Sequence, residues 1–326
     1  MEISRAFNLY MEYCRSKQLR QRTMLSYEQT IKLFIRWLKE VEGIDQIEQI
    51  KEVTIRHYIL ELQSRGKYTF YADERQTASN NPDRRRDYRH TVSVTTINNY
   101  IRNLRAFFTW FTDELRLANP MDRIRQLPSE RKPQEFLEDA EIDKLLKSFD
   151  LSYFSEHRDY TIVMLLLDTG MRIGECLQIT TDDLDMQERT IFLPAENTKG
   201  RRSRMVFFSV KMARILGRWL RFKDRYSESS LLFPVKAGTP MEIRSFEGSF
   251  RKHLQRIGIE KDFSPHALRN NFAKRCLMAG MDLYSLSRIL GHSSVTVTEK
   301  AYLDLTDRDL RHRYQQYSPL ENMKRQ

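Results

Sequence analysis

The stretch 264–304 limits the possible folds most, because it combines a helical pattern with several chemically reactive side chains. Ser264 can cap a helix, and Pro265 is tolerated in a first helical turn. Apolar residues then recur at helical spacing as far as Gly280, which suits a helix end. A second short helix is expected over 283–290. We therefore predict that this stretch forms short helices folded back on one another.

Four side chains of this stretch suit phosphate chemistry. His266 and Arg269 are three residues apart and project from one face of the helix start. His292 follows the second helix, and Tyr302 lies ten residues later on a third helix-like run. Arginine binds phosphate through a fork, histidine moves protons, and a tyrosine hydroxyl can attack phosphorus. Each residue alone is more typical of a helical bundle, as a capping histidine, a surface arginine or a half-buried tyrosine.

Two upstream motifs add to this set. TGMRIGE at 169–175 follows an apolar helical run, and its two glycines allow tight backbone, so Arg172 can be held rigidly at a helix junction. Residues 190–193 and 205–208 indicate two strands of a hairpin. The turn between them is basic and contains Lys199, which a mobile turn could bring to a site. A solvated turn is the ordinary alternative.

These motifs together resemble the tyrosine recombinase (phage-integrase-like, Xer-like) family. The matching residues are an arginine in TGMRIGE, a lysine in a hairpin turn, HALR, LGH and a tyrosine ten residues after that. The resemblance covers roughly 137–305, with a weaker likeness in the N-terminal part. The six matching positions are Arg172, Lys199, His266, Arg269, His292 and Tyr302.

The resemblance implies a mainly α fold with a small β-hairpin or sheet in the catalytic domain. A helical core-DNA-binding domain is expected over 1–118, a proline-bearing linker over 119–136, and a catalytic domain with a C-terminal helical tail over 137–326. Apolar periodicity in the first domain indicates a four-helix bundle. Its helices are expected over 3–17, from Thr23 to Gly43, from Thr54 to Gly66, and from Thr95 or Thr96 to Leu115.

A long charged insertion at 67–92 departs from the family pattern, in which the third and fourth helices are joined by a few residues. A loop of this length is either disordered or functional. It combines arginines with Tyr68, Phe70, Tyr71 and Tyr88. A solvated loop, contact with phosphates, and contact with a neighbouring protomer all remain open.

The composition of the chain favours a polyanionic binding partner. The chain has 326 residues, a formal net charge of +11 and 40% hydrophobic residues, enough for two cores. Cys14, Cys176 and Cys276 fall in no metal-ligand spacing and are most simply reduced, which suits the cytosol. Neither a signal sequence nor a membrane-spanning run is evident. We therefore expect a cytoplasmic protein with double-stranded DNA as partner.

The resemblance implies a role for each matching residue. Arg172 and Arg269 would clamp the scissile phosphate, and His292 would donate a further hydrogen bond to it. Tyr302 would attack, forming a 3′-phosphotyrosyl link. Lys199 would protonate the leaving 5′-oxygen.

The remaining implied roles are supporting ones. His266 would assist proton transfer around the tyrosine, and Glu175 would orient basic residues. Because the tyrosyl ester keeps the phosphodiester energy, the resemblance implies no ATP, no metal and no other cofactor. The basic residues expected to contact DNA are Arg201, Arg202, Arg204, Arg251 and Lys252.

The predicted activity is site-specific recombination by a tetramer on paired DNA sites, with the C-terminal tail exchanged between subunits. The integrase or transposase of a mobile element and a Xer-like resolvase both fit these motifs. Two other functions remain open on the same fold. One is a catalytically inactive DNA-binding protein, and the other is strand nicking like that of a type IB topoisomerase.

Overall fold

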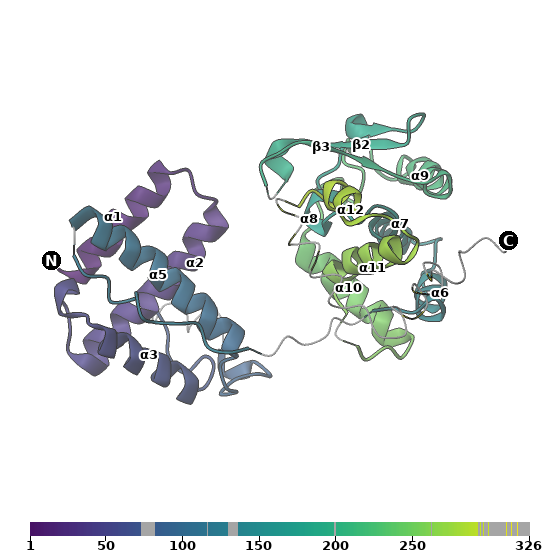
Figure 1. Cartoon of the computed structure of the whole chain (residues 1–326). Helices are drawn as coiled ribbons and strands as arrows, with labels where there is room; N and C mark the ends of the chain where they lie inside the picture. Colours follow the sequence, from purple (N-terminus) through teal and green to yellow (C-terminus); the bar gives the residue numbers. More distant parts are fainter. Residues whose placement is uncertain are drawn as a thin grey trace. The chain divides into compact units, whose positions relative to one another are not determined.

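The protein divides into two compact units, Met1–Arg131 and Lys132–Gln326, in a computed structural model (Figure 1). Each unit is considered by itself. The structure describes residues 1–72, 82–115, 117–129, 136–198, 200–261 and 263–292, together with positions 294, 296, 299, 311, 314 and 318.

The N-terminal unit is built on the four predicted helices, and this part of the fold prediction is confirmed. Each helix buries one apolar stripe, as the helical spacing of its large residues requires. Among the residues that the structure describes, these helices are α1 (Ile3–Ser16), α2 (Gln21–Trp37), α3 (Glu52–Ser64) and α5 (Val94–Leu115). α2 packs against both α1 and α5, and α3 packs against α5.

Aromatic side chains fill the centre of this unit. Phe34, Trp37 and Tyr58 pack together, with the Phe34 and Tyr58 ring centroids 4.8 Å apart. Phe107 and Phe108 extend the cluster from α5. Burying a large apolar side chain stabilises a fold by roughly 1.5–3 kcal/mol, so these rings supply much of the driving force for the bundle.

The stretch expected to be a linker begins as part of this unit. Met121 and Ile124 are buried in its core. The buried amide of Asn98 pairs with the backbone of Leu127 in both directions, at 2.9 and 2.8 Å. Residues 119–129 therefore pack on α5, because two apolar residues among the charges bury themselves there.

The described ends of the 67–92 insertion are anchored to each other. The Lys67 amide donates to the His90 carbonyl at 2.7 Å, and the Arg89 amide donates to the Lys67 carbonyl at 3.0 Å. Gly66 at this junction has no room for a side chain, because a Cβ there would lie 2.7 Å from Arg89 Cα. The Arg36 guanidinium of α2 also donates to the Tyr71 carbonyl at 3.1 Å. The central part of the insertion, 73–81, lies outside the described residues.

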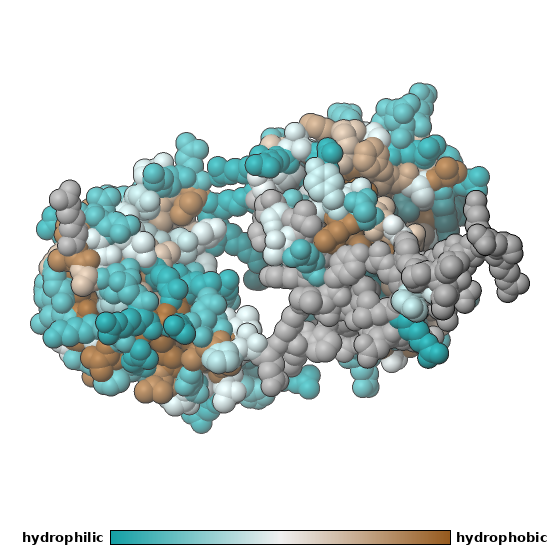
Figure 2. Space-filling model, in the orientation of Figure 1, coloured by the Kyte–Doolittle hydropathy of each residue, from teal (hydrophilic) through white to brown (hydrophobic). Residues whose placement is uncertain are grey.

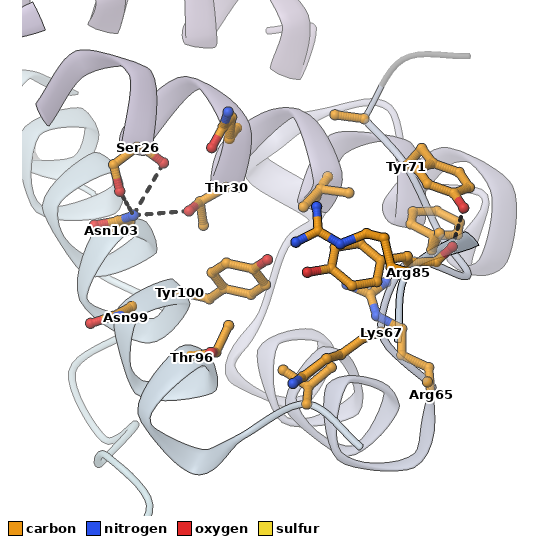
Figure 3. Close-up of a pocket in the computed structure, with 17 residues that line it drawn as sticks. Ser26, Thr30, Arg65, Lys67, Tyr71, Arg85, Thr96, Asn99, Tyr100 and Asn103 are labelled. Carbon is orange, nitrogen blue, oxygen red and sulfur yellow. Dashed lines mark hydrogen bonds between the residues drawn. The ribbon is translucent and has the colours of Figure 1, made fainter. Parts of the chain in front are cut away.

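A cavity of about 510 Å³ lies between this insertion, α2 and α5 (Figure 3). Arg85 and Tyr100 are among the side chains drawn around it, and the Asn103 amide on one wall donates to Ser26 and Thr30. Tyr68, Phe70 and Tyr71 of the insertion also line the cavity and are half-buried. The described ends of the insertion are thus packed rather than fully solvated.

The C-terminal unit is organised around α7 (Phe154–Thr169), which buries apolar residues on most of its sides. Such a helix belongs in a core. α7 packs against α11, beside which it lies in Figure 1, and also against α9. The other α-helices within the described part of this unit are α6 (Asp139–Lys147), α8 (Ile173–Cys176), α9 (Val210–Lys223), α10 (Ile243–Arg256), α11 (Pro265–Met278) and α12 (Leu283–Leu290).

A small antiparallel sheet completes this unit, in the order β1-β2-β3. Its strands are β1 (Leu184–Asp185), β2 (Thr190–Leu193) and β3 (Arg204–Phe207). Ile191 is paired with Val206, and both face the core. Phe192 and Phe207 alternate outward and are exposed, and Figure 2 shows a tan apolar patch where Figure 1 places β2 and β3. The predicted hairpin is confirmed, and β1 is an addition to it.

Candidate active site

Arg172 stands where the chain turns from α7 into α8. α7 ends at Thr169, and Gly170 has a φ of +64°, in the left-handed region that favours glycine. A Cβ on Gly170 would also lie 2.8 Å from a methyl carbon of Leu290. The turn then makes Arg172 the N-cap residue of α8, with its side chain 25% exposed. The tight turn therefore fixes the backbone position from which the Arg172 side chain extends.

Glu175 is the buried carboxylate that holds Arg172. It accepts from the Arg172 amide and from Arg172 Nη1, both at 2.9 Å. It also accepts from Arg204 Nη1 at 3.1 Å and Nη2 at 2.7 Å. Burial alone would raise the pKa of Glu175, but the hydrogen bonds and charge of Arg204 and Arg172 outweigh it and hold that pKa below its ordinary value. Glu175 is therefore ionised and orients two guanidinium groups.

Arg269 ties two helix ends together. Its side chain is almost fully buried and donates from Nη1 to the Gly170 carbonyl and from Nη2 to the Leu290 carbonyl, both at 2.7 Å. These carbonyls lie just before Arg172 and His292. Burial, and then the charge of Arg172, lowers the pKa of Arg269 to about 9, so the guanidinium stays charged at neutral pH.

His292 follows the left-handed end of α12 and is half-buried. Burial first, and then the electrostatic influence of Arg269, Arg172, Arg204 and His266, lowers the pKa of His292 to about 4. At neutral pH the imidazole is therefore neutral, and one ring nitrogen carries a proton that it can donate. His266 is exposed in the first turn of α11, on the same helix as Arg269.

Two predicted catalytic residues, Lys199 and Tyr302, lie outside the described residues. The hairpin connection beside Lys199 is described. Thr198 is buried, and its hydroxyl hydrogen-bonds to backbone groups of Ala195 and Arg202. The chain is thus held directly before the lysine position.

The five basic residues predicted to contact DNA fall into two groups. Arg201 and Arg202 are exposed on the hairpin connection, and Arg251 and Lys252 are exposed on α10. Arg204 differs, because its side chain is 13% exposed and bound to the carboxylate described above. The alternation of side chains along a strand could have predicted this burial, since Arg204 and the buried Val206 share one face of β3.

The described residues of the site bear an excess of positive charge. Arg172, Arg204 and Arg269 contribute three guanidinium groups, and Glu175 contributes the carboxylate that contacts two of them. Several cations that are held close together favour the binding of an anion between them. The forked donors of a guanidinium match the oxygens of a phosphate well. The geometry therefore fits the binding of a phosphate group.

Comparisons with known proteins agree with this chemistry. The family model described as "Phage integrase family" matches residues 135–309, and "Phage integrase, N-terminal SAM-like domain" matches residues 7–78. Tyrosine recombinase XerC of Bacillus subtilis (strain 168) is 26% identical over 319 residues, which are 95% of each chain. A tyrosine recombinase of Thermosipho africanus is 30% identical over 217 residues, covering 66% of this chain and 73% of the relative.

Solved structures show the same fold. The Tn1549 transposon integrase in complex with transposon right end DNA has a TM-score of 0.71 at 20% identity, covering 97% of this chain and 99% of that chain. The chain belongs to the phage integrase family and is a tyrosine recombinase. The resemblance predicted from the motifs is confirmed, and so is the two-part, mainly helical fold. Among the described residues, no helix is long and apolar enough to cross a membrane.

Proposed function

We propose that this tyrosine recombinase cleaves and rejoins DNA at specific sites through a 3′-phosphotyrosyl intermediate. The observation that supports it most is the joining of the Arg172 and His292 segments by the buried Arg269. This link would bring side chains that are far apart in the sequence around one phosphate. Their positive charge would stabilise the extra negative charge of a pentacovalent transition state.

In this mechanism Arg172 and Arg269 hold the non-bridging oxygens of the scissile phosphate. A guanidinium carries five N–H donors, and the two carbonyl bonds of Arg269 use two of them. The others remain for oxygens of the substrate. His292 donates a hydrogen bond as a neutral imidazole, in keeping with its lowered pKa. Glu175 keeps Arg172 in place without touching the phosphate.

Tyr302 would supply the nucleophile. Its phenolic oxygen forms a bond to phosphorus as the bond from phosphorus to the 5′-oxygen breaks, and Lys199 gives that oxygen a proton. His266 assists transfer of the phenolic proton. The second step reverses these events with a new 5′-hydroxyl. The phosphodiester energy stays in the tyrosyl ester, so this sequence of steps balances without ATP.

We propose that the N-terminal unit grips one side of the duplex and the C-terminal unit acts on the phosphate. XerH site-specific recombinase bound to its difH substrate and the Tn1549 integrase bound to transposon DNA are neighbours in fold. We further propose that the active form is a tetramer on paired sites in the cytoplasm, with C-terminal tails exchanged between subunits. Arg201, Arg202, Arg251 and Lys252 are the exposed residues that we assign to DNA contact.

Covalent trapping on nicked suicide substrates, made from DNA flanking the gene, tests this function. We expect a protein–DNA adduct that survives denaturation, and recombination between two such sites on one plasmid. Relaxation of supercoils by a monomer without site preference would instead favour a topoisomerase-like activity. Tight binding with no adduct on any of these substrates would favour an inactive DNA-binding protein.

A further inference from the structure

Arg204 is largely buried beside the proposed active site, although it is the first residue of an edge strand. It forms a two-pronged ion pair with Glu175, at 3.1 and 2.7 Å. The Arg204 side chain is 13% exposed and that of Glu175 is 2% exposed. A forked pair with this burial is geometrically specific, and lysine could not reproduce both bonds.

The same carboxylate holds Arg172. Glu175 takes two N–H groups from Arg172 and two from Arg204, one of each to each oxygen. If Arg204 is removed, half of the donors to this buried carboxylate are lost. The carboxylate would then rotate or recruit water, and Arg172 would move with it.

Arg204 also contacts the turn before His292. A Cβ on Gly291 would lie 2.8 Å from Arg204 Cδ and 2.9 Å from its Nε, so the arginine stem packs directly against this glycine. Nε is buried and has no hydrogen-bond partner among the described residues. An unpaired buried donor is costly, so the position of this side chain is fixed by its other contacts.

We infer that Arg204 is a positioning residue for strand cleavage, which sets Arg172 through Glu175 and fixes β3 against Gly291. The hairpin whose turn carries Lys199 is thereby kept in register with the helix ends that carry Arg172 and His292. This inference rests on the proposed function. A DNA-contact role fits less well, because the guanidinium is buried and its two Nη groups are already bound to Glu175.

Substitution of Arg204 gives the first test. We compare Arg204→Met, which removes the fork and the charge, with Arg204→Lys, which keeps the charge. Arg214→Met, at an exposed position on α9, is the matched control. Because a misplacement of about 1 Å can cost ~100-fold in rate, we expect Arg204→Met to slow adduct formation about that much. DNA affinity should stay within about threefold, since no phosphate contact is lost. Arg204→Lys should recover part of the rate, and Arg214→Met should match the wild type.

A double variant separates positioning from a general loss of structure. If Arg204 acts through Glu175, Arg204→Met combined with Glu175→Gln should be hardly slower than the slower single variant. Independent, multiplying losses would overturn the inference. So would an unchanged rate in Arg204→Met, or a loss of DNA affinity that accounts for the whole effect.

Histidine NMR provides a readout that does not need activity. The groups that act on His292 are Arg204 from β3, Arg172 before α8, and Arg269 and His266 from α11, with Glu175 beside the arginines. Removing the positive charge of Arg204 should raise the pKa of His292, whereas Arg214→Met should leave it unchanged. An unchanged His292 pKa in Arg204→Met contradicts the inference even if no substrate is found. A wild type without adduct activity would count against the proposed function instead.

Discussion

Arg269 is both a buried link between two helix ends and the proposed phosphate ligand, so its removal should cost stability as well as activity. Arg269→Ala leaves the Gly170 and Leu290 carbonyls without their charged donor. Hydrogen bonds to charged groups contribute roughly 1.5–3 kcal/mol each, so the loss of two should lower the free energy of unfolding by about 3–6 kcal/mol. Urea denaturation monitored by circular dichroism measures it.

Arg172→Ala is the natural comparison. Its side chain is 25% exposed, and Glu175 keeps Arg204 as a partner when Arg172 is truncated. We expect a smaller loss of stability, about 1 kcal/mol, although cleavage should be crippled equally. Equal losses of stability in the two variants would contradict the structural role given to Arg269.

His292 should make stability depend on pH. Its folded pKa of about 4 lies below the ordinary value of 6.5, so between these limits the unfolded chain binds the extra proton. Stability should therefore be fully present above about pH 6.5 and fall as the pH drops toward 4. His292→Gln should lose less thermal stability between pH 7 and pH 5 than the wild type. Scanning calorimetry at the two pH values checks this, and identical losses would refute it.

At the residue scale, the sequence patterns predict the chemical type of the site residues better than they predict which residues are in contact. Glu175 is expected to orient basic residues, and Arg172, one helical turn earlier, is one of the two arginines that it binds. The pairing of Arg204 with Glu175 was missed, because it joins a strand and a helix that are distant in the sequence. Contacts also differ between sequence neighbours: Arg251 and Lys252 are exposed on α10, whereas the adjacent His253 is buried against Phe149 with ring centroids 4.0 Å apart.

At the scale of elements, the turn between α7 and α8 restricts the amino acid at position 170 to glycine. Gly170→Ala would place a Cβ against Phe272 and Leu290 in a left-handed conformation. Strain of this kind costs about 1–3 kcal/mol, and the clash should add to it. We expect a lower melting temperature and slower adduct formation, since Arg172 follows this turn directly.

Gly248→Ala is the matched control for that change. Gly248 lies within α10, and nothing is within 4 Å of the place that its Cβ would occupy. Alanine is favoured over glycine in a helix by up to ~1 kcal/mol, so this variant should be as stable as the wild type or more so. A Gly170→Ala protein that behaves like Gly248→Ala would disprove the account of the turn.

Helices with strong apolar periodicity were predictable to within a few residues, because their pattern is local. α1 was expected over 3–17 and is observed at Ile3–Ser16. The two-residue strand β1 was not predictable from its own sequence, since it is defined by its pairing with β2. The linker prediction for 119–136 rests on prolines and charges, which are local, whereas the burial of Met121 and Ile124 depends on packing against other helices of the N-terminal unit.

For the whole molecule, the net charge of +11 should make DNA binding strongly dependent on salt. Each phosphate contact that is lost reduces the slope of log affinity against log salt by about 1. We expect the double variant Arg251→Ala, Lys252→Ala to reduce this slope by about 1 to 2. Fluorescence anisotropy at several salt concentrations measures it, and an unchanged slope would remove α10 from the DNA interface.

The central claim for the molecule is that Tyr302 attacks a phosphate held by Arg172, Arg269 and His292. The most direct measurement is trapping on a suicide substrate followed by protease digestion and mass spectrometry of the DNA-linked peptide. The account predicts a 3′-phosphate link on Tyr302, and no adduct with Tyr302→Phe although that variant binds DNA as tightly as the wild type. An adduct that persists in Tyr302→Phe, or that maps to another residue such as Tyr284 or Tyr314, would contradict it.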